Sequence, residues 1–513
     1  SNTLTAEPSR FTAAMDKVIL NRFLGLPIFL FVMYLMFLLA INIGGALQPI
    51  FDAGSVAIFV HGIQWLGYTL HFPDWLTVFL AQGIGGGINT VLPLVPQIGM
   101  MYLFLSFLED SGYMARAAFV MDRLMQALGL PGKSFVPLIV GFGCNVPSVM
   151  GARTLDAPRE RLMTIMMAPF MSCGARLAIF AVFAAAFFGQ NGALAVFSLY
   201  VLGIVMAILT GLMLKHTIMR GEASPFVMEL PVYHVPHIKS LIIQTWQRLK
   251  GFVLRAGKVI VIVSIFLSAL NSFSLSGKVV DNINDSALAS VSRVITPVFK
   301  PIGVHEDNWQ ATVGLFTGAM AKEVVVGTLN TLYTAEDIQN EEFNPQTFSL
   351  GEELLAAVDE TWQGLKDTFS LSVLANPIEA SKGDGEMATG AMGVMGSKFG
   401  SAAAAYSYLI FVLLYIPCIS VMGAIARESS RGWMTFSILW GLNIAYSLST
   451  LYYQTVSFSD HPRYSLVCIL AVVLFNVVLF GLLRRARSRV DVSLLATRKT
   501  PASCCSSPAG DCH

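Results

Sequence analysis

The sequence predicts an all-α polytopic membrane protein, with about eight transmembrane helices plus broken or re-entrant segments in two repeated halves. Two observations predict this class. Of the 513 residues, 55% are hydrophobic and only 13% are charged. Residues 24–46 form an uncharged apolar stretch that is long enough to cross the roughly 30 Å hydrocarbon core of a bilayer. The lipid bilayer is therefore an expected partner. The formal net charge of +1, without basic runs interleaved with aromatic residues, gives no reason to expect nucleic acid.

Further apolar segments follow the first span along the chain. Residues 1–23 lack the hydrophobic core of a signal peptide, so we expect them to form a cytosolic amphipathic lead-in. The chain starts at Ser1 without an initiating methionine, so we expect the natural protein to extend upstream. The other expected spans are roughly 85–108, 162–189, 192–214, 258–275, 311–333, 402–426, 433–456 and 465–483.

Basic residues predict the orientation of these spans. Lys17 and Arg22 precede the first span, a run of arginines at 484–489 follows the last one, and more bases surround the central loop at 219–257. The positive-inside rule places all three regions in the cytosol, which implies cytosolic termini and an even number of crossings. We favour eight crossings, with one apolar segment re-entrant. Residues 246–250 form a basic amphipathic stretch suited to the membrane surface.

A second large region between spans is acidic. Residues 334–400 carry twelve acidic residues against three basic ones, and become rich in glycine and methionine near their end. Within this insertion, residues 352–369 are expected to form a helix. Its side of the membrane stays open, because loops longer than about 60 residues escape the charge rule.

Two apolar segments are interrupted by glycine and proline beside a thiol. The first is Gly-Phe-Gly-Cys-Asn-Val-Pro-Ser at 141–148, and the second is Pro-Cys-Ile-Ser-Val-Met-Gly at 417–423. Glycine and proline break helices and release backbone carbonyls. Such breaks at membrane depth line a cavity or lie buried in protein, and paired breaks in two halves indicate a transport site. A soft thiol at each break suggests a transition-metal cargo. The candidate helix-break residues are Gly141, Gly143, Asn145, Pro147, Ser148, Pro417, Ser420 and Gly423.

The chain also repeats itself. Residues 111–120 align with 317–326, and Ser-Val-Met-Gly-Ala at 148–152 recurs at 420–424. A Met-Thr pair at 163–164 then matches one at 434–435. Three matched blocks in the same order indicate two related halves, and the acidic insertion lies within the second. This alignment leaves Cys144 and Cys418 two residues out of step, which weakens the expectation that these thiols face each other.

Four motifs carry a resemblance to a known family. They are Glu-Asp-Ser-Gly-Tyr-Met-Ala-Arg at 109–116, Gly-Phe-Gly-Cys-Asn-Val-Pro at 141–147, Gly-Ala-Met-Ala-Lys-Glu at 318–323 and Pro-Cys at 417–418. They resemble the two gate regions of the bacterial ferrous iron transport protein B family, FeoB, and residues 228–257 resemble its central segment. The resemblance covers the chain from about residue 10 onward. These segments also resemble, more distantly, the gates of nucleoside-recognition membrane proteins.

The resemblance implies the membrane permease portion of a GTP-dependent uptake transporter in the bacterial inner membrane, with Fe²⁺ as the transported ion. Family members carry a GTP-binding domain before the first span, so GTP and Mg²⁺ are expected to act only through that domain. This chain is not expected to be an enzyme. Its one candidate P-loop, residues 129–134, has Ala127 where the first Walker glycine belongs, and we interpret it as a turn. The implied partners are the GTP-binding domain and small cytosolic accessory proteins of the same uptake system. A homo-oligomer is left open.

These observations divide the chain into seven regions. They are the lead-in 1–23, the first span and surface segment 24–83, gate region 1 at 84–218, the central basic segment and span 219–310, gate region 2 at 311–460 with the acidic insertion, the last span and basic anchor 461–489, and a Cys-rich tail 490–513.

Three thiols are candidate metal ligands. Cys144 and Cys418 are placed at helix breaks, where a thiol can reach an ion, although a buried cysteine is more often a small hydrophobe. Cys173 follows Pro169 in a similar setting, and both interpretations stay open for it. Cys468 lies in a uniform apolar span, and we expect it to serve as packing. The tail residues Cys504, Cys505, Cys512 and His513 could form an accessory metal site.

Charged residues at the gates are open to two interpretations. Glu109 and Glu323 could supply oxygen ligands, or they could pair with Arg116 and Lys322 at helix ends. Arg176 falls inside the expected span at 162–189, where a charge is costly enough to suggest a function. It could snorkel to an interface or repel cations at a gate.

Two other functions remain open from the sequence. One is a carrier of nucleosides or other small solutes with similar gate segments. The other is a membrane signalling or scaffold protein in which the cysteines are inert packing.

Overall fold

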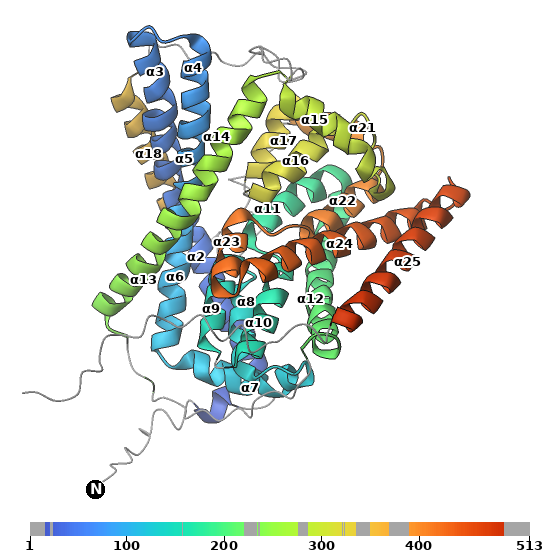
Figure 1. Cartoon of the computed structure of the whole chain (residues 1–513). Coiled ribbons are helices and arrows are strands. Elements are labelled where there is room, and N and C mark those ends of the chain that lie inside the picture. Colours follow the sequence, from blue (N-terminus) through green and yellow to red (C-terminus); the bar gives the residue numbers. More distant parts are fainter. Residues whose placement is uncertain are drawn as a thin grey trace, which may run out of the picture.

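The computed structural model describes residues 16–20, 24–155, 157–219, 233, 236–274, 286–320, 322, 324–334, 349–368 and 389–486. These residues are predominantly helical, which confirms the predicted all-α class (Figure 1). Five of the nine expected spans coincide with helical stretches that are long and apolar enough to cross a membrane. The other four expected spans also contain helices. The five stretches are Pro27–Thr69, Pro158–Phe188, Gly192–His216, Ala402–Glu428 and Pro462–Arg485.

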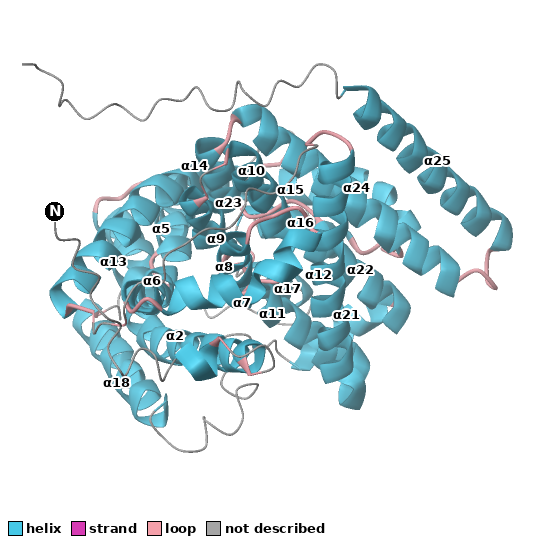
Figure 2. Ribbon diagram, turned by 90° about the horizontal axis from the view of Figure 1, so that it is seen from below, coloured by secondary structure: helices cyan, strands magenta, loops and turns pink. Residues whose placement is uncertain are grey.

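The N-terminal helices form one side of the molecule. They are α2 (Gly25–Ser55), η1 (Val56–His61), α3 (Gly62–Thr69), α4 (Asp74–Leu80), η2 (Ala81–Gly85), α5 (Gly86–Val91) and α6 (Leu94–Asp110). The acidic insertion supplies α18 (Leu350–Thr368), which confirms the helix expected at 352–369. Figure 2 shows α18 beside α2, and His61 Nδ1 lies 2.9 Å from Glu353 Oε2. This contact attaches α18 to the first candidate span.

The first repeated half consists of short helices separated by breaks. It contains α7 (Tyr113–Ala127), η3 (Gly132–Ser134), α8 (Phe135–Val140), α9 (Asn145–Gly151), η4 (Ala152–Thr154), α10 (Pro158–Met167), η5 (Ala168–Phe170), α11 (Gly174–Phe183), η6 (Ala184–Phe188), η7 (Gly189–Asn191) and α12 (Gly192–His216). Residues 141–144 separate α8 from α9, where the two glycines favour a turn over continued helix. The candidate P-loop at 129–134 is a turn followed by η3 between two helices, as the sequence predicted.

A long central helix links the two halves. It comprises α13 (Ile238–Phe252), η8 (Val253–Gly257) and α14 (Lys258–Ser272), which Figure 1 shows as one continuous rod. The basic stretch expected at the membrane surface is therefore the first part of a longer helix, which packs against α6. Trp246 on this helix is exposed.

The second repeated half has the same pattern of helix, break and helix. It contains α15 (Ala287–Ile295), η10 (Thr296–Ile302), α16 (Trp309–Met320), α17 (Val324–Thr334), α21 (Thr389–Phe399), α22 (Ala402–Leu414), α23 (Ile419–Glu428), α24 (Arg431–Val456) and α25 (Pro462–Ala486). Residues 415–418, which include Pro417, separate α22 from α23. The long helix α24 packs against both α22 and α25.

Helix α25 lies at the edge of the molecule in both views (Figure 1, Figure 2). Its apolar side chains are largely exposed, including Leu466, Val467 and Leu470. An exposed apolar helix of this length is suited to contact with lipid tails.

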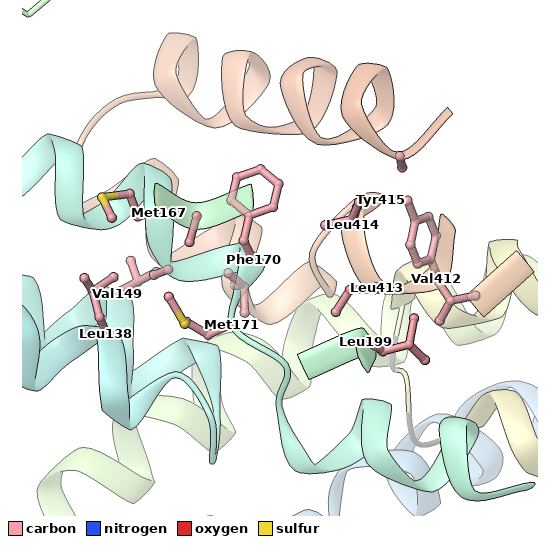
Figure 3. Close-up of a cluster of buried hydrophobic side chains, with 14 of the residues drawn as sticks. Leu138, Val149, Met167, Phe170, Met171, Leu199, Val412, Leu413, Leu414 and Tyr415 are labelled. Atoms are coloured by element: carbon pink, nitrogen blue, oxygen red, sulfur yellow. The ribbon is translucent and has the colours of Figure 1, made fainter. Parts of the chain in front are cut away.

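The two halves share one hydrophobic core around their breaks. Figure 3 shows Phe170 and Met171, which follow α10, near Leu413 and Tyr415 at the end of α22. Leu199 of α12 belongs to the same cluster. The helix breaks therefore lie against this core, and broken backbone at membrane depth must be buried in protein or line a cavity.

An ionic cluster also joins the halves. The Glu428 carboxylate at the end of α23 accepts from Arg153 Nε at 2.6 Å and from Arg161 Nη2 at 3.1 Å. A second hydrogen bond links Arg153 Nη2 to Glu428 Oε1. The hydrogen bonding by Glu428 raises the pKa of the Arg153 guanidinium. The short helices α9 and α23 pack together beside this cluster.

Candidate functional site

A cavity of about 80 Å³ lies where the broken helices meet. A single water needs roughly 10–15 Å³ on this measure, so the space suits several waters or one partly hydrated ion. Its lining joins both repeated halves and the N-terminal helices α2 and α6. The chemically active lining residues are Cys144, Asn145, Cys173, Arg176, Lys322 and Cys418, with Gln97 from α6.

Each of the three thiols immediately precedes a helix. Cys144 is the N-cap residue of α9, Cys173 of α11 and Cys418 of α23. Helix N-termini present backbone N–H groups and the positive end of the helix dipole. Three helix N-termini therefore converge on one cavity. The position of Cys144 and Cys418 is equivalent in the two halves, although the sequence alignment placed them two residues out of step.

Two hydrogen bonds join the break before α9 to the break before α11. Gly174 N donates to Gly143 O at 3.2 Å, and Asn145 Nδ2 donates to Met171 O at 3.3 Å. A Cβ atom at Gly141 would lie 2.9 Å from Met171 Cβ, so only glycine allows this approach. The opposite end of the Asn145 amide, Oδ1, is buried and has no hydrogen-bond partner within the described residues. It is available to a water or a cation.

The charged groups of the lining are both positive. The Arg176 side chain is fully buried, and its Nη1 donates to Pro169 O at 3.0 Å and Met171 O at 2.8 Å. Lys322 is 3% exposed, and its Nζ donates to Val412 O at 3.2 Å. The same Nζ lies 4.5 Å from the centre of the Tyr415 ring. No carboxylate of the described residues lines the cavity.

Several predicted residues lie outside this lining. Ser148 Oγ donates to Pro137 O at 2.6 Å, so it ties α9 to α8. Glu109 accepts from Arg248 Nη2 at 2.9 Å, and Arg116 pairs with Asp16, so the pairing of Glu109 with Arg116, one of the two interpretations, is not formed. The remaining candidates outside the lining are Gly141, Pro147, Pro417, Ser420 and Gly423. Glu323, Cys504, Cys505, Cys512 and His513 lie outside the described residues.

The thiols surround the cavity without forming a closed site. Across the described ranges, no three Cys, His, Asp or Glu side chains are close enough to hold one metal ion together. None of the four described cysteines forms a disulfide. The arrangement therefore places soft groups around a cavity and differs from a tight structural metal site.

Two further lining residues, Lys322 and Gln97, were not predicted from the sequence. A charge at membrane depth is a general signal of function, and it would have singled out Lys322. Gln97 sits in an otherwise apolar helix and carries no comparable signal in the sequence.

Comparisons with known proteins agree with this architecture. The family model for the Gate domain, described as nucleoside recognition, matches residues 91–187 and 253–431, which contain all three thiols of the cavity. The chain belongs to this family. A second model, described as ferrous iron transport protein B C terminus, matches residues 196–248.

The similarity to curated relatives extends over the whole chain. The chain is 91% identical over 513 residues to the Fe(2+) transporter FeoB of Salmonella typhimurium (strain LT2) and to that of Salmonella typhi. It is 90% identical over 514 residues to the Fe(2+) transporter FeoB of Escherichia coli (strain K12). These matches confirm the resemblance to FeoB. The chain spans 66% of the length of these relatives. No solved structure matches it.

Proposed function

We propose that this chain is the membrane permease portion of a Fe²⁺ uptake transporter, and that Fe²⁺ passes through the cavity at the helix breaks. The observation that carries the proposal is the convergence of Cys144, Cys173 and Cys418 on one cavity. The FeoB relatives, which are named as Fe(2+) transporters, support the choice of ion. Thiolate ligands suit transition metals better than Mg²⁺ or Ca²⁺.

The similarity to the FeoB relatives supports the setting that we propose for this permease. It lies in the bacterial inner membrane with cytosolic termini, and GTP and Mg²⁺ act through a GTP-binding domain on the same longer protein. That domain and small cytosolic accessory proteins of the uptake system are its partners, and it can form a homo-oligomer. The turn at 129–134 gives this chain no phosphate-binding loop of its own among its described residues.

Charge determines how the ion enters. Arg176 and Lys322 repel a divalent cation, so the thiols must lose their protons for the ion to bind. Three thiolates would offset both cations and leave one negative charge. Fe²⁺ then exchanges water for one or two thiolates and the Asn145 Oδ1 oxygen in turn. Because no closed set of ligands surrounds the described cavity, binding is weak enough for release. Selectivity for Fe²⁺ must come from the availability of the metal ions and from this transient binding, since the intrinsic affinity of a given site for divalent ions rises from Fe²⁺ to Cu²⁺.

The test is uptake into proteoliposomes that contain the full-length transporter, measured under reducing conditions with Fe²⁺, Zn²⁺ and Mn²⁺. Cys144→Ser and Cys418→Ser should each reduce Fe²⁺ uptake strongly, because oxygen replaces a soft ligand with little change in volume. Cys468→Ser is the matched control, since Cys468 lies in α25 outside the cavity lining. Uptake equal to wild type in both single variants would exclude a ligand role for these thiols.

A carrier of nucleosides or other small solutes is the second candidate, favoured by the description of the Gate family model. The cavity argues against it. Its volume of about 80 Å³ is well below the roughly 300 Å³ at which pockets for drug-sized ligands begin. Uptake of radiolabelled nucleoside that does not respond to Fe²⁺ would favour this second function.

A further inference from the structure

We propose that the same cavity binds a small monovalent inorganic anion of the halide type, held by Arg176 and the N-terminal end of α11. This site is distinct in chemistry from the path for a cation. The anion site is inferred from the hydrogen-bond donors in the cavity, whereas the transport proposal is inferred from its thiols.

The first observation is a set of unused donors on a buried cation. Only one nitrogen of the Arg176 guanidinium, Nη1, is occupied, by the carbonyl oxygens of Pro169 and Met171. Nε and Nη2 are buried and meet no acceptor within the described residues, although the side chain lines the cavity. A buried guanidinium with two unsatisfied donors is costly, and a bound acceptor relieves this cost.

The second observation is the positive charge of the described residues around these donors. Arg176 and Lys322 both line the cavity, and no carboxylate of the described part of the chain joins them there. The N-terminal end of α11 adds the positive end of its helix dipole at Cys173. A helix N-terminus beside an arginine favours an anion, because the helix dipole and the guanidinium donors attract it together.

The size and lining of the cavity indicate which anion. About 80 Å³ accommodates a halide with a few waters. The surrounding side chains include Ala40, Ile98, Met101 and Val421, and an apolar wall of this kind favours a singly charged, weakly hydrated ion over phosphate. Asn145 Oδ1 repels an anion directly and would accept from one of the waters beside it.

An anion at this position has a consequence that rests on the proposed function. It would lower the positive field that a divalent cation meets in the cavity, so iron binding and anion binding would be coupled. Anion binding itself requires no iron, so either proposal can fail while the other stands.

The experiment titrates chloride into the purified full chain in detergent, with gluconate as the balancing anion, and follows the ³⁵Cl NMR linewidth. Wild-type protein should show saturable broadening that bromide reverses. Arg176→Gln should weaken chloride binding by about tenfold or more, the loss expected for a charge-assisted hydrogen bond in a buried site. Arg484→Gln, which removes an exposed charge in the last turn of α25, should leave binding unchanged.

A second pair of variants avoids any change of charge. Gly174→Ala places a methyl group at the cavity wall, where its nearest new neighbour would be Gly143 O at 3.8 Å, so the helix tolerates it. This methyl should weaken chloride binding. Gly481→Ala on α25 meets nothing within 4 Å and should not. This pair decides the question if Arg176→Gln does not fold.

Three results would overturn the proposal. They are linear broadening without saturation, equal affinity in wild type and Arg176→Gln, and equal affinity in Gly174→Ala and Gly481→Ala. Stronger displacement by phosphate than by bromide would overturn the assignment to a halide.

Discussion

Neutralising Glu428 should loosen the contact between the two repeated halves. Its carboxylate side chain is 2% exposed and receives hydrogen bonds from Arg153 and Arg161 of the first half. Glu428→Gln keeps the shape of the side chain and removes its charge. The two arginines would then face an amide with one acceptor oxygen in place of two, so some of their N–H groups would lose a hydrogen bond.

The expected cost follows from how far each partner is buried. Breaking a fully buried ion pair costs about 3–5 kcal/mol. Here the side chains of Arg153 and Arg161 are 51% and 35% exposed, so water compensates part of the loss. Hydrogen bonds to charged groups contribute about 1.5–3 kcal/mol each, and the amide retains some of them. We therefore expect a loss of about 2–3 kcal/mol of unfolding free energy.

The matched control is Glu306→Gln. Glu306 Oε1 lies 2.9 Å from Lys300 Nζ, and the two side chains are 59% and 58% exposed. An exposed pair of this kind contributes about 0–1 kcal/mol. The measurement is the midpoint of thermal unfolding in detergent micelles, with chemical denaturation as a second probe. If the two substitutions lower stability equally, the Glu428 cluster does not hold the halves together.

Three further predictions follow from the site. Purified chain should not bind GTP at micromolar concentration, because residues 129–134 form a turn between helices; binding in a filtration assay would contradict this. Gly141→Ala should cost about 1–3 kcal/mol through the clash with Met171, whereas Gly481→Ala should cost less, as compared by unfolding midpoints. Binding of Co²⁺ as a probe metal should strengthen as pH rises, by up to about tenfold per pH unit for each thiol proton released. Calorimetry in buffers of different ionisation enthalpy counts these protons, and affinity independent of pH would exclude thiolate ligation.

Local sequence signals predicted the helix breaks well. Glycine at 141 and 143 and proline at 417 act on their own stretch of backbone, and the structure interrupts its helices at those places. The helix within the acidic insertion was predicted for the same reason, since a strongly amphipathic pattern forms a helix locally. The thiols meet because each one sits at such a break.

Side-chain partners could not be predicted in this way. Arg116 contacts Asp16, which lies 100 residues earlier, and Glu109 contacts Arg248, which lies 139 residues later. These pairs depend on the packing of separate helices, and charge spacing in the sequence gives no information about it. The same limit applied to Arg176, for which snorkelling and repulsion of cations were both open until its burial was known.

The equivalence of Cys144 and Cys418 shows a different limit. Aligning the halves on Ser-Val-Met-Gly-Ala separates these thiols by two residues, yet each one directly precedes a helix, α9 or α23. Ser148 is the fourth residue of α9 and Ser420 the second of α23, so the helix starts differ by two residues relative to the motif. A helix begins where the break before it ends. The length of a connecting segment can change between the two halves more easily than the packing of their helices.

The two halves have also diverged, and the cavity depends on this divergence. The offset between the Met-Thr pairs places Cys173 and Arg176 opposite Ile444 and Ser447, within the unbroken helix α24. The second half therefore has no counterpart of the break that carries the third thiol and the buried guanidinium. Conversely, Lys322 lines the cavity, while its counterpart Arg116 is paired with Asp16 elsewhere.

An exactly repeated pair of gates would present the same groups twice. This cavity instead combines equivalently placed thiols, Cys144 and Cys418, with two positive side chains at non-equivalent positions, one from each half. Most of its polar lining comes from the first half, through residues 143–145 and 173–176. Substitutions at residues 173–176 should therefore change ion binding more than substitutions at the corresponding residues 444–447 of α24, a helix that packs against α22 and α25 and serves the structure of the second half.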